Sequence, residues 1–201
     1  MDSSALYRDI TDFAHTTPVW VQTTAEVWTE LGLLLFGVLF LTLWWRARTL
    51  GPHAFSAALL APLVTAFGYV VSELVKSAVE EERPCRAVAG AASPLIDCPA
   101  YGDWSFPSNH SAIAGAAAIA IALVLPRLAL LTVPMALLMA YSRVFTGVHY
   151  PHDVAVGLLL GGAVAAVLMI LLTGTTSRLV STVRSSGVGP AVWFTGPGPA
   201  R

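Results

Sequence analysis

Charge is scarce in this sequence. Of its 201 residues only 11% are charged, whereas about a quarter are charged in an ordinary soluble domain. The 11 basic and 12 acidic residues nearly cancel, at a formal net charge of -1, and Lys76 is the only lysine. The chain has neither the basic patch of a nucleic-acid-binding protein nor an acidic disordered tail, so we expect no nucleic-acid partner.

Apolar residues are abundant instead. They make up 56% of the chain, and the mean hydropathy is +0.70; a chain this short cannot bury that much apolar surface inside itself. Five uncharged or nearly uncharged segments cover residues 31–45, 54–72, 111–126, 128–142 and 154–177. A spanning helix needs roughly 20 apolar residues, a length that the third and fourth segments reach only with their polar ends in the headgroup layer. The sequence predicts an all-α, polytopic membrane helical bundle of about five transmembrane helices, with Pro126-Arg127 as the turn of a hairpin.

The charges sort by side when these five spans alternate across a bilayer. One side receives arginines and no acidic residue: Arg46, Arg48, Arg127, Arg178, Arg184 and Arg201. The acidic residues, from Asp2 to Asp153, fall on the other side or at the adjacent span ends. By the positive-inside rule the arginine side is cytoplasmic. We therefore expect a multi-pass protein of the plasma (inner) membrane whose N-terminus and 79–107 loop face outward.

Three regions follow from this pattern. Residues 1–25 form an outward-facing segment in which residues 4–15 have amphipathic spacing, typical of an interfacial helix, although a frayed extension fits equally well. Residues 26–173 form the transmembrane domain. Residues 174–201, rich in Ser, Thr, Gly and Pro, predict a flexible cytoplasmic tail.

Ionisable residues collect at the outward ends of the spans, where their cost suggests a function. The three groups are Lys76 with Arg83, then Ser108, Asn109 and His110, then Arg143, His149 and Asp153. Lys76 and Arg83 lie seven residues apart, which places them on one helix face if the second span continues that far. Pro84 would then end that helix.

The second and third groups fit an anion site. Ser108 is a natural N-cap, and the helix that follows offers free N–H groups and positive dipole charge. Arg143 has a guanidinium suited to phosphate. Pro151 predicts a helix start that places His149 just before the helix and Asp153 in its first turn, within reach of the imidazole.

At these residues the chain resembles the type 2 phosphatidic acid phosphatase (PAP2) family of membrane lipid phosphatases. The family signature is Lys-x6-Arg-Pro, then Pro-Ser-Gly-His, then Ser-Arg-x5-His-x3-Asp. Here the segments read Lys76-x6-Arg83-Pro84, Pro107-Ser108-Asn109-His110 and Ser142-Arg143-x5-His149-x3-Asp153. Asn109 replaces the usual glycine, and since Asn tolerates left-handed backbone better than most residues, we expect the turn to be kept.

The resemblance implies a role for each matched residue. His149 would attack phosphorus and form a phosphohistidine, with Asp153 orienting it, and His110 would be the general acid and then the base. The phosphoryl oxygens would be bound by Lys76, Arg83, Arg143, Ser108 and the backbone at Asn109. The resemblance implies no cofactor and no metal.

We expect a membrane-embedded lipid phosphate as substrate and the bilayer as partner; the oligomeric state stays open. The resemblance points first to polyprenyl diphosphate, hydrolysed to the monophosphate. Phosphatidylglycerophosphate, phosphatidic acid and a phosphorylated decaprenyl-sugar are the rivals. Two other classes fit less well: a metal-dependent hydrolase using His110, His149 and Asp153, and a non-catalytic transporter of anionic lipids.

The cysteines, His152, the acidic run and two glycines are not among the fixed residues of the family motifs, and we expect structural roles for them. Cys85 and Cys98, both in the outward loop, predict a disulfide worth about 3 kcal/mol in the chain-entropy model. His152 and the acidic run 80–82 are expected to support the site or face water. Gly157 and Gly161 predict close helix packing within the fold rather than a dimer interface.

Overall fold

The computed structural model describes residues 3–199, so Asp2 and Arg201 of the charge argument lie outside it. The chain is all α-helical, as expected. Its elements are α1 (Ser4–Thr16), α2 (Val19–Ala47), α3 (Pro52–Val79), α4 (Pro84–Ala87), α5 (Asn109–Val124), a 3-10 turn η1 (Pro126–Leu128), α6 (Ala129–Phe145), α7 (Pro151–Ser185) and α8 (Gly189–Thr195).

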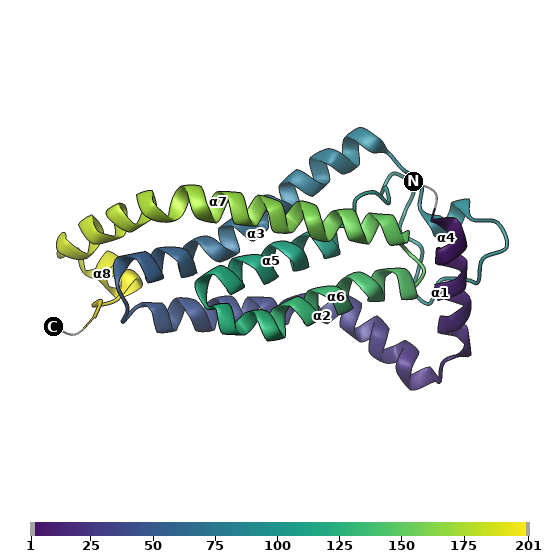
Figure 1. Cartoon of the computed structure of the whole chain (residues 1–201), viewed down its shortest axis with the longest axis horizontal. Helices are drawn as coiled ribbons and strands as arrows, with labels where there is room; N and C mark the ends of the chain where they lie inside the picture. Colours follow the sequence, from purple (N-terminus) through teal and green to yellow (C-terminus); the bar gives the residue numbers. More distant parts are fainter. Residues whose placement is uncertain (1–2, 200–201) are drawn as a thin grey trace.

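The long helices run roughly side by side along one axis (Figure 1). Within residues 3–199, four stretches are long and apolar enough to cross a membrane: Val19–Ala47, Pro52–Ala87, Pro126–Phe145 and Pro151–Ser185. Their outward faces carry large apolar side chains such as Leu34, Leu41, Leu130, Leu159 and Ile170. Such exposure suits lipid rather than water, and the chain is a multi-pass membrane protein.

The third expected span, α5, is shorter than the other four, and its neighbours enclose it. It has 16 residues, about 24 Å of helix, and lies among α3, α6 and α7 (Figure 1). Its alanines are buried, Ala112, Ala116 and Ala120 being fully inaccessible. The expected turn between the third and fourth spans is also present, as η1.

Glycines let α5 and α7 touch backbone to backbone. A Cβ at Gly161 would lie 1.9 Å from the carbonyl oxygen of Ala112, and one at Gly157 would lie 2.6 Å from that of Ser108. From the other side, a Cβ at Gly115 would lie 2.4 Å from the carbonyl oxygen of Leu158. The prediction that Gly157 and Gly161 pack within the fold is confirmed.

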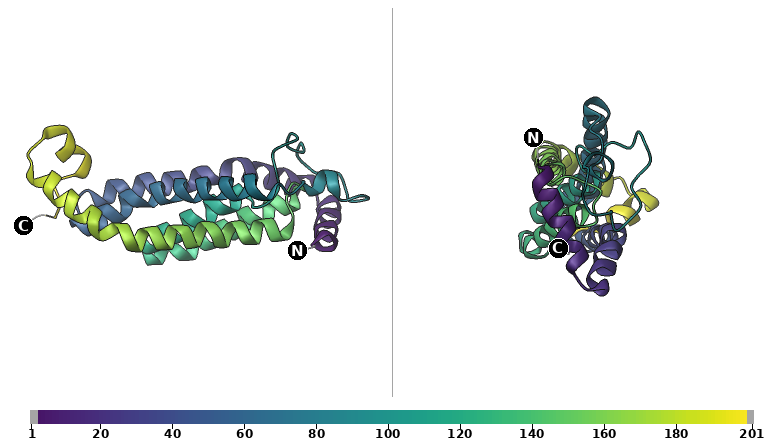
Figure 2. Two further views of the ribbon diagram at one scale, coloured as in Figure 1. Left: turned by 90° about the horizontal axis from the view of Figure 1, so that it is seen from above. Right: turned by 90° about the vertical axis from the view of Figure 1, so that its right-hand side faces the viewer.

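Helix α1 lies across the end of the bundle, beside α4 (Figures 1 and 2). Its apolar and polar residues fall on opposite sides, as the spacing of residues 4–15 predicts, and Tyr7 on the inner side is fully buried. The Tyr7 hydroxyl donates a hydrogen bond to the carbonyl oxygen of Gly147, at 2.8 Å. The N-terminal segment is therefore tied to the turn that leads into His149.

The sequence expectation for the end of the second span is wrong. Helix α3 ends at Val79 because Glu80 adopts a left-handed conformation, with φ of 52°. Arg83 therefore lies outside the helix of Lys76, and Pro84 starts α4 instead of ending α3. At the other end of the chain, α2 begins at Val19, so residues 19–25 of the N-terminal region form the first turns of that helix.

The C-terminal segment has more regular structure than its composition suggests. Helix α7 continues to Ser185, and α8 follows. The Arg48 guanidinium stacks on Trp44 and Trp193, and Arg184 donates hydrogen bonds to the carbonyl oxygens of Leu50 and Thr195. These contacts hold α8 against the end of the bundle, within the segment whose composition predicts a flexible tail; residues 186–188 and the Gly-Pro stretch after Thr195 are not helical.

Candidate active site

The residues of the three sequence clusters meet at the end of the bundle that carries α1 and α4. His149 follows α6, and Asp153 occupies the first turn of α7 behind the N-terminal Pro151. His149 Nδ1 lies 3.2 Å from Asp153 Oδ2, and both side chains are buried. The same oxygen accepts hydrogen bonds from Ser105 Oγ, at 2.5 Å, and from the Tyr150 N–H, at 2.8 Å. Asp153 is thus fixed by three groups, and it fixes the imidazole.

Arg83 lies on the other edge of the same imidazole. Its Nη1 is 3.1 Å from His149 Nε2 and also donates to the Val148 carbonyl oxygen, at 3.0 Å. Arginine is only a donor, so Nε2 is the accepting nitrogen and the ring proton is on Nδ1, facing Asp153. This tautomer leaves the Nε2 lone pair directed at the guanidinium side of the site.

The surroundings keep this imidazole uncharged. Burial, together with the charges of Arg143, Arg83 and Lys76, lowers the pKa of His149 well below its ordinary value of 6.5. A neutral imidazole with one unprotonated nitrogen is the nucleophilic form of histidine.

Lys76 reaches the site through a shared carboxylate rather than through a common helix face. Asp103 Oδ1 lies 2.8 Å from Arg83 Nη2 and 3.6 Å from Lys76 Nζ. Burial opposes ionisation of Asp103, but the hydrogen bond and charges of Arg83 and Lys76 outweigh it and keep the Asp103 pKa below its usual value. Both cations are almost fully buried, so the structure gathers positive charge where an anion can bind.

The second cluster begins α5. Ser108 is the N-cap residue, although its hydroxyl makes no capping hydrogen bond. Its N–H donates to the Asp153 carbonyl oxygen, at 3.2 Å, which joins the starts of α5 and α7. His110 is half-buried in the first turn and interacts electrostatically with Arg143 and His149.

Asn109 keeps the turn by a different route from the one we expected. It is the first residue of α5 and needs no left-handed backbone; among residues 3–199, Glu80 is the only non-glycine with positive φ. Its Oδ1 accepts a hydrogen bond from Ser72 Oγ, at 2.7 Å, and its Nδ2 donates to Glu73. The side chain that replaces the family glycine therefore fastens α5 to α3.

Arg143 completes the cationic group from α6. It is buried, and its Nη1 donates to Thr29 Oγ1 at 2.9 Å, with Glu30 at 4.0 Å. Helix α2 thus holds the guanidinium in place.

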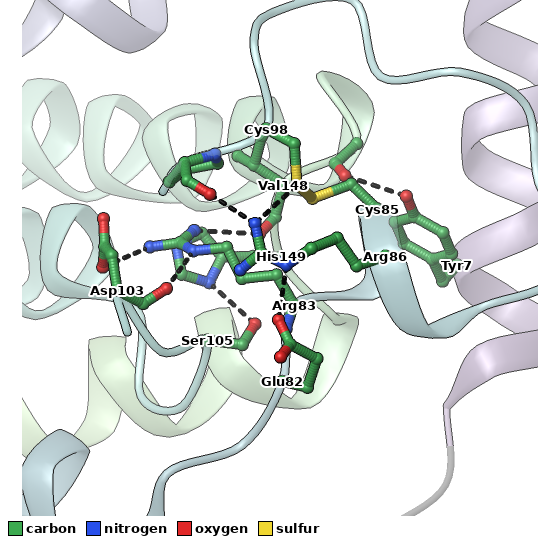
Figure 3. The surroundings of a disulfide bond; sticks show 12 residues. Tyr7, Glu82, Arg83, Cys85, Arg86, Cys98, Asp103, Ser105, Val148 and His149 are labelled. Atoms are coloured by element: carbon green, nitrogen blue, oxygen red, sulfur yellow. Dashed lines mark hydrogen bonds and ion pairs between the residues drawn. A yellow bond between two sulfur atoms is a disulfide. The ribbon is translucent and has the colours of Figure 1, made fainter. Parts of the chain in front are cut away.

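A disulfide between Cys85 and Cys98 closes the loop beside Arg83, in the pairing that the sequence suggests (Figure 3). Arg86, next to Cys85, donates to Glu82 and to the Pro99 carbonyl oxygen. The disulfide and the Arg86 contacts therefore join the chain next to Arg83 to the chain that leads to Asp103.

Sequence reasoning missed two residues of the site, Ser105 and Asp103. Both lie in the loop before α5, where no periodicity gives a side chain's direction. The one usable signal for Ser105 is its place two residues before Pro107, where the second motif begins.

Several known proteins are similar to this chain. Residues 57–176 match the model of the PAP2 superfamily. Decaprenylphosphoryl-5-phosphoribose phosphatase of Mycobacterium tuberculosis is 40% identical over 101 residues, which are 49% of this chain and 52% of the relative. Undecaprenyl-diphosphatase BcrC of Bacillus subtilis is 32% identical over 143 residues, 70% of this chain and 67% of the relative. The chain thus spans about half the length of the first of these relatives and two thirds of the second.

A solved structure shows the same fold. It is described as a transmembrane PAP2 type phosphatidylglycerolphosphate phosphatase from Bacillus subtilis, and it aligns with a TM-score of 0.62 at 23% identity, covering 87% of this chain and 86% of that one.

Proposed function

The chain belongs to the PAP2 superfamily, and from that premise we propose that it is a lipid phosphatase whose preferred substrate is a polyprenyl diphosphate. The observation that carries the proposal is the buried, neutral His149, held by Asp153 at Nδ1 and with its unprotonated Nε2 facing the guanidinium of Arg83. A phosphoryl group bound there lies against a nucleophile that is already in its reactive tautomer.

The reaction has two steps. In the first, His149 Nε2 forms a bond to phosphorus while the bond from phosphorus to the leaving oxygen breaks, and His110 donates a proton to that oxygen. The charge on the three equatorial oxygens is stabilised by Arg83, Lys76 and Arg143. In the second step His110 takes a proton from water, the water oxygen bonds to phosphorus, and the P–N bond breaks to release phosphate and restore His149.

Asp153 acts through His149 in both steps. As Nε2 bonds to phosphorus the imidazole gains positive charge, which the carboxylate stabilises across the 3.2 Å contact with Nδ1. When phosphate binds, it replaces the Asp103 carboxylate beside Arg83 and Lys76. The Asp103 side chain is half exposed, so its carboxylate can turn into water and its charge does not stay buried without a partner.

Membrane location supports a lipid substrate. The site lies at one end of an apolar bundle, so a substrate with its phosphate at headgroup depth and its chains in lipid reaches it from the bilayer. The arginine-only loops at the opposite end favour an outward-facing site by the positive-inside rule. The Bacillus relative named undecaprenyl-diphosphatase, the one of these two that aligns over most of this chain, supports the diphosphate.

A phosphorylated polyprenyl-sugar is the second candidate, supported by the 40% identity to the Mycobacterium tuberculosis phosphatase. Both candidates use the same chemistry, and they differ in the leaving group.

The test is phosphate release by the purified chain from a panel of lipids, with and without chelator. The panel contains polyprenyl diphosphate, polyprenyl monophosphate, a phosphorylated polyprenyl-sugar, phosphatidylglycerophosphate and phosphatidic acid. We expect the fastest turnover of the diphosphate, and no loss of activity in chelator. Equal rates on all five would reject the substrate assignment. Release that survives His149→Ala would reject His149 as the nucleophile, and no release from any of the five lipids would favour a non-catalytic lipid transporter.

A further inference from the structure

A second polar cluster adjoins Asp153 at the carboxylate oxygen that does not face His149. His152 Nε2 lies 3.4 Å from Asp153 Oδ1, and it lies 3.1 and 3.3 Å from the two carboxylate oxygens of Glu81. His152 Nδ1 lies 2.7 Å from Ser3 Oγ. The catalytic mechanism uses neither Glu81 nor His152.

Asp153 Oδ1 is the unexplained atom of this cluster. Its partner oxygen, Oδ2, accepts two hydrogen bonds and contacts His149, whereas Oδ1 is buried and has no hydrogen-bond partner. Asp153 is wholly inaccessible, and the His152 side chain is only 9% exposed. A buried carboxylate oxygen without a donor is costly and points to a bound water or ion.

The donor set fits a divalent transition-metal ion. One imidazole nitrogen and two carboxylate oxygens lie within 4.8 Å of one another, and no other group of three such donors is found among residues 3–199. Tetrahedral zinc with bonds near 2.0–2.2 Å sets its ligand atoms about 3.3 Å apart, close to the separations around His152 Nε2. The two carboxylates also neutralise a 2+ charge, so no charge is left buried without a partner.

Other features favour zinc over hard cations. Mg²⁺ requires about six oxygen ligands, whereas imidazole suits zinc and its transition-metal neighbours. The contact between Ser3 Oγ and His152 Nδ1 fixes the ring so that Nε2 faces the carboxylates, as an outer partner of a ligating histidine does.

We propose that Glu81, His152 and Asp153 bind one Zn²⁺-type cation, separate from the phosphate site, that regulates the enzyme. The ion does not contact phosphate and takes no part in the reaction. Bound at Oδ1, it withdraws charge from the carboxylate whose other oxygen holds His149, so the imidazolium formed during phosphoryl transfer is stabilised less. Metal binding therefore slows turnover, and the metal-stripped protein is the fully active form.

Binding is tested on the full chain, purified in detergent and stripped of metal, by calorimetric titration with Zn²⁺. We expect one equivalent to bind, at least about tenfold weaker binding in Glu81→Gln and in His152→Gln, and no competition from excess Mg²⁺. Glu80→Gln is the matched control, because Glu80 is the exposed neighbour in the same acidic run, and it should bind as the parent does. Thermal melting curves check that each variant folds.

A second measurement does not depend on variants. Co²⁺ bound to the unaltered chain should give the visible absorption of a low-coordinate site, and Zn²⁺ should remove it. No saturable binding of either ion, or binding that both Glu81→Gln and His152→Gln retain, overturns the proposal.

The regulatory arm rests on the proposed function, and the binding arm does not. Added Zn²⁺ should lower the rate of phosphate release, chelator should restore it, and Glu81→Gln should be insensitive. A chain that binds Zn²⁺ as expected but releases no phosphate from any lipid refutes the proposed function alone. Zinc inhibition that persists in Glu81→Gln refutes the coupling to His149.

Discussion

The contact between α5 and α7 sets the spacing of the active site, and Gly161→Ala tests it. Ala112, which faces Gly161, lies two residues after His110, and Gly161 lies two helical turns after Asp153. The added Cβ would be 1.9 Å from the Ala112 carbonyl oxygen, and Cβ atoms essentially never approach closer than 3.0 Å. The obstacle is backbone, so the helices must separate by about 1 Å.

The expected loss follows from two opposing effects. Alanine gains about 1 kcal/mol over glycine from helix propensity, while overpacking costs about 1–3 kcal/mol and approaches the upper end when a backbone atom is hit. We expect a net destabilisation of about 2 kcal/mol. A misplacement of about 1 Å between His110 and His149 can also reduce kcat by about 100-fold.

The assays are thermal unfolding in detergent micelles and phosphate release at saturating substrate. Gly174→Ala is the control, since it lies on the same helix and its Cβ would meet nothing within 4 Å; it should be at least as stable as the parent and as active. If Gly161→Ala has the same melting temperature as Gly174→Ala and keeps full activity, the contact between α5 and α7 does not position the site.

Three further predictions follow. Asp153→Asn should fold and bind substrate but lower kcat by about 10²–10⁴-fold, since the imidazolium formed on His149 loses its counter-charge. A raised KM with an unchanged kcat would contradict this role. Replacing Cys85 and Cys98 together with serine should lower the free energy of unfolding by about 3 kcal/mol, measured against the oxidised parent; an unchanged melting temperature would show that the bond adds nothing. Burial, with a smaller effect of a neighbouring tyrosine, raises the pKa of Tyr7 to about 12, so the contribution of Tyr7 to stability is complete below pH 10 and is lost as the pH rises toward 12. Tyr7→Phe should lower the free energy of unfolding by about 1 kcal/mol at pH 8, and its melting temperature should depend less on pH between pH 9 and 11 than that of the parent. The same pH dependence in both proteins would refute the raised pKa.

Most of the bundle could be predicted because hydrophobic length is a local signal. The apolar segments mark the long helices, and Pro151 marks the start of α7 together with the positions of His149 and Asp153. What failed depends on tertiary contact. Glu80 ends α3 in a left-handed conformation that its residue type disfavours, and α8 is ordered by stacking on Arg48.

The candidate site divides in the same way. Residues at fixed spacing from a helix start could be placed by geometry, whereas Asp103 and Ser105 come from an irregular loop whose path is set by the disulfide and by Arg83. Asn109 shows the limit of reasoning from residue type alone. Its tolerance of left-handed backbone is irrelevant here, because its amide instead binds Ser72 and Glu73 on another helix.

The central claim is that His149 carries the phosphoryl group during turnover. Labelled lipid phosphate, mixed with the enzyme and quenched in alkali within the first turnovers, should leave one phosphoryl group on the chain, at His149 by peptide mass spectrometry and absent from His149→Gln. A phosphoryl group on His110, or steady phosphate release by His149→Gln at the parent's rate, would contradict the account.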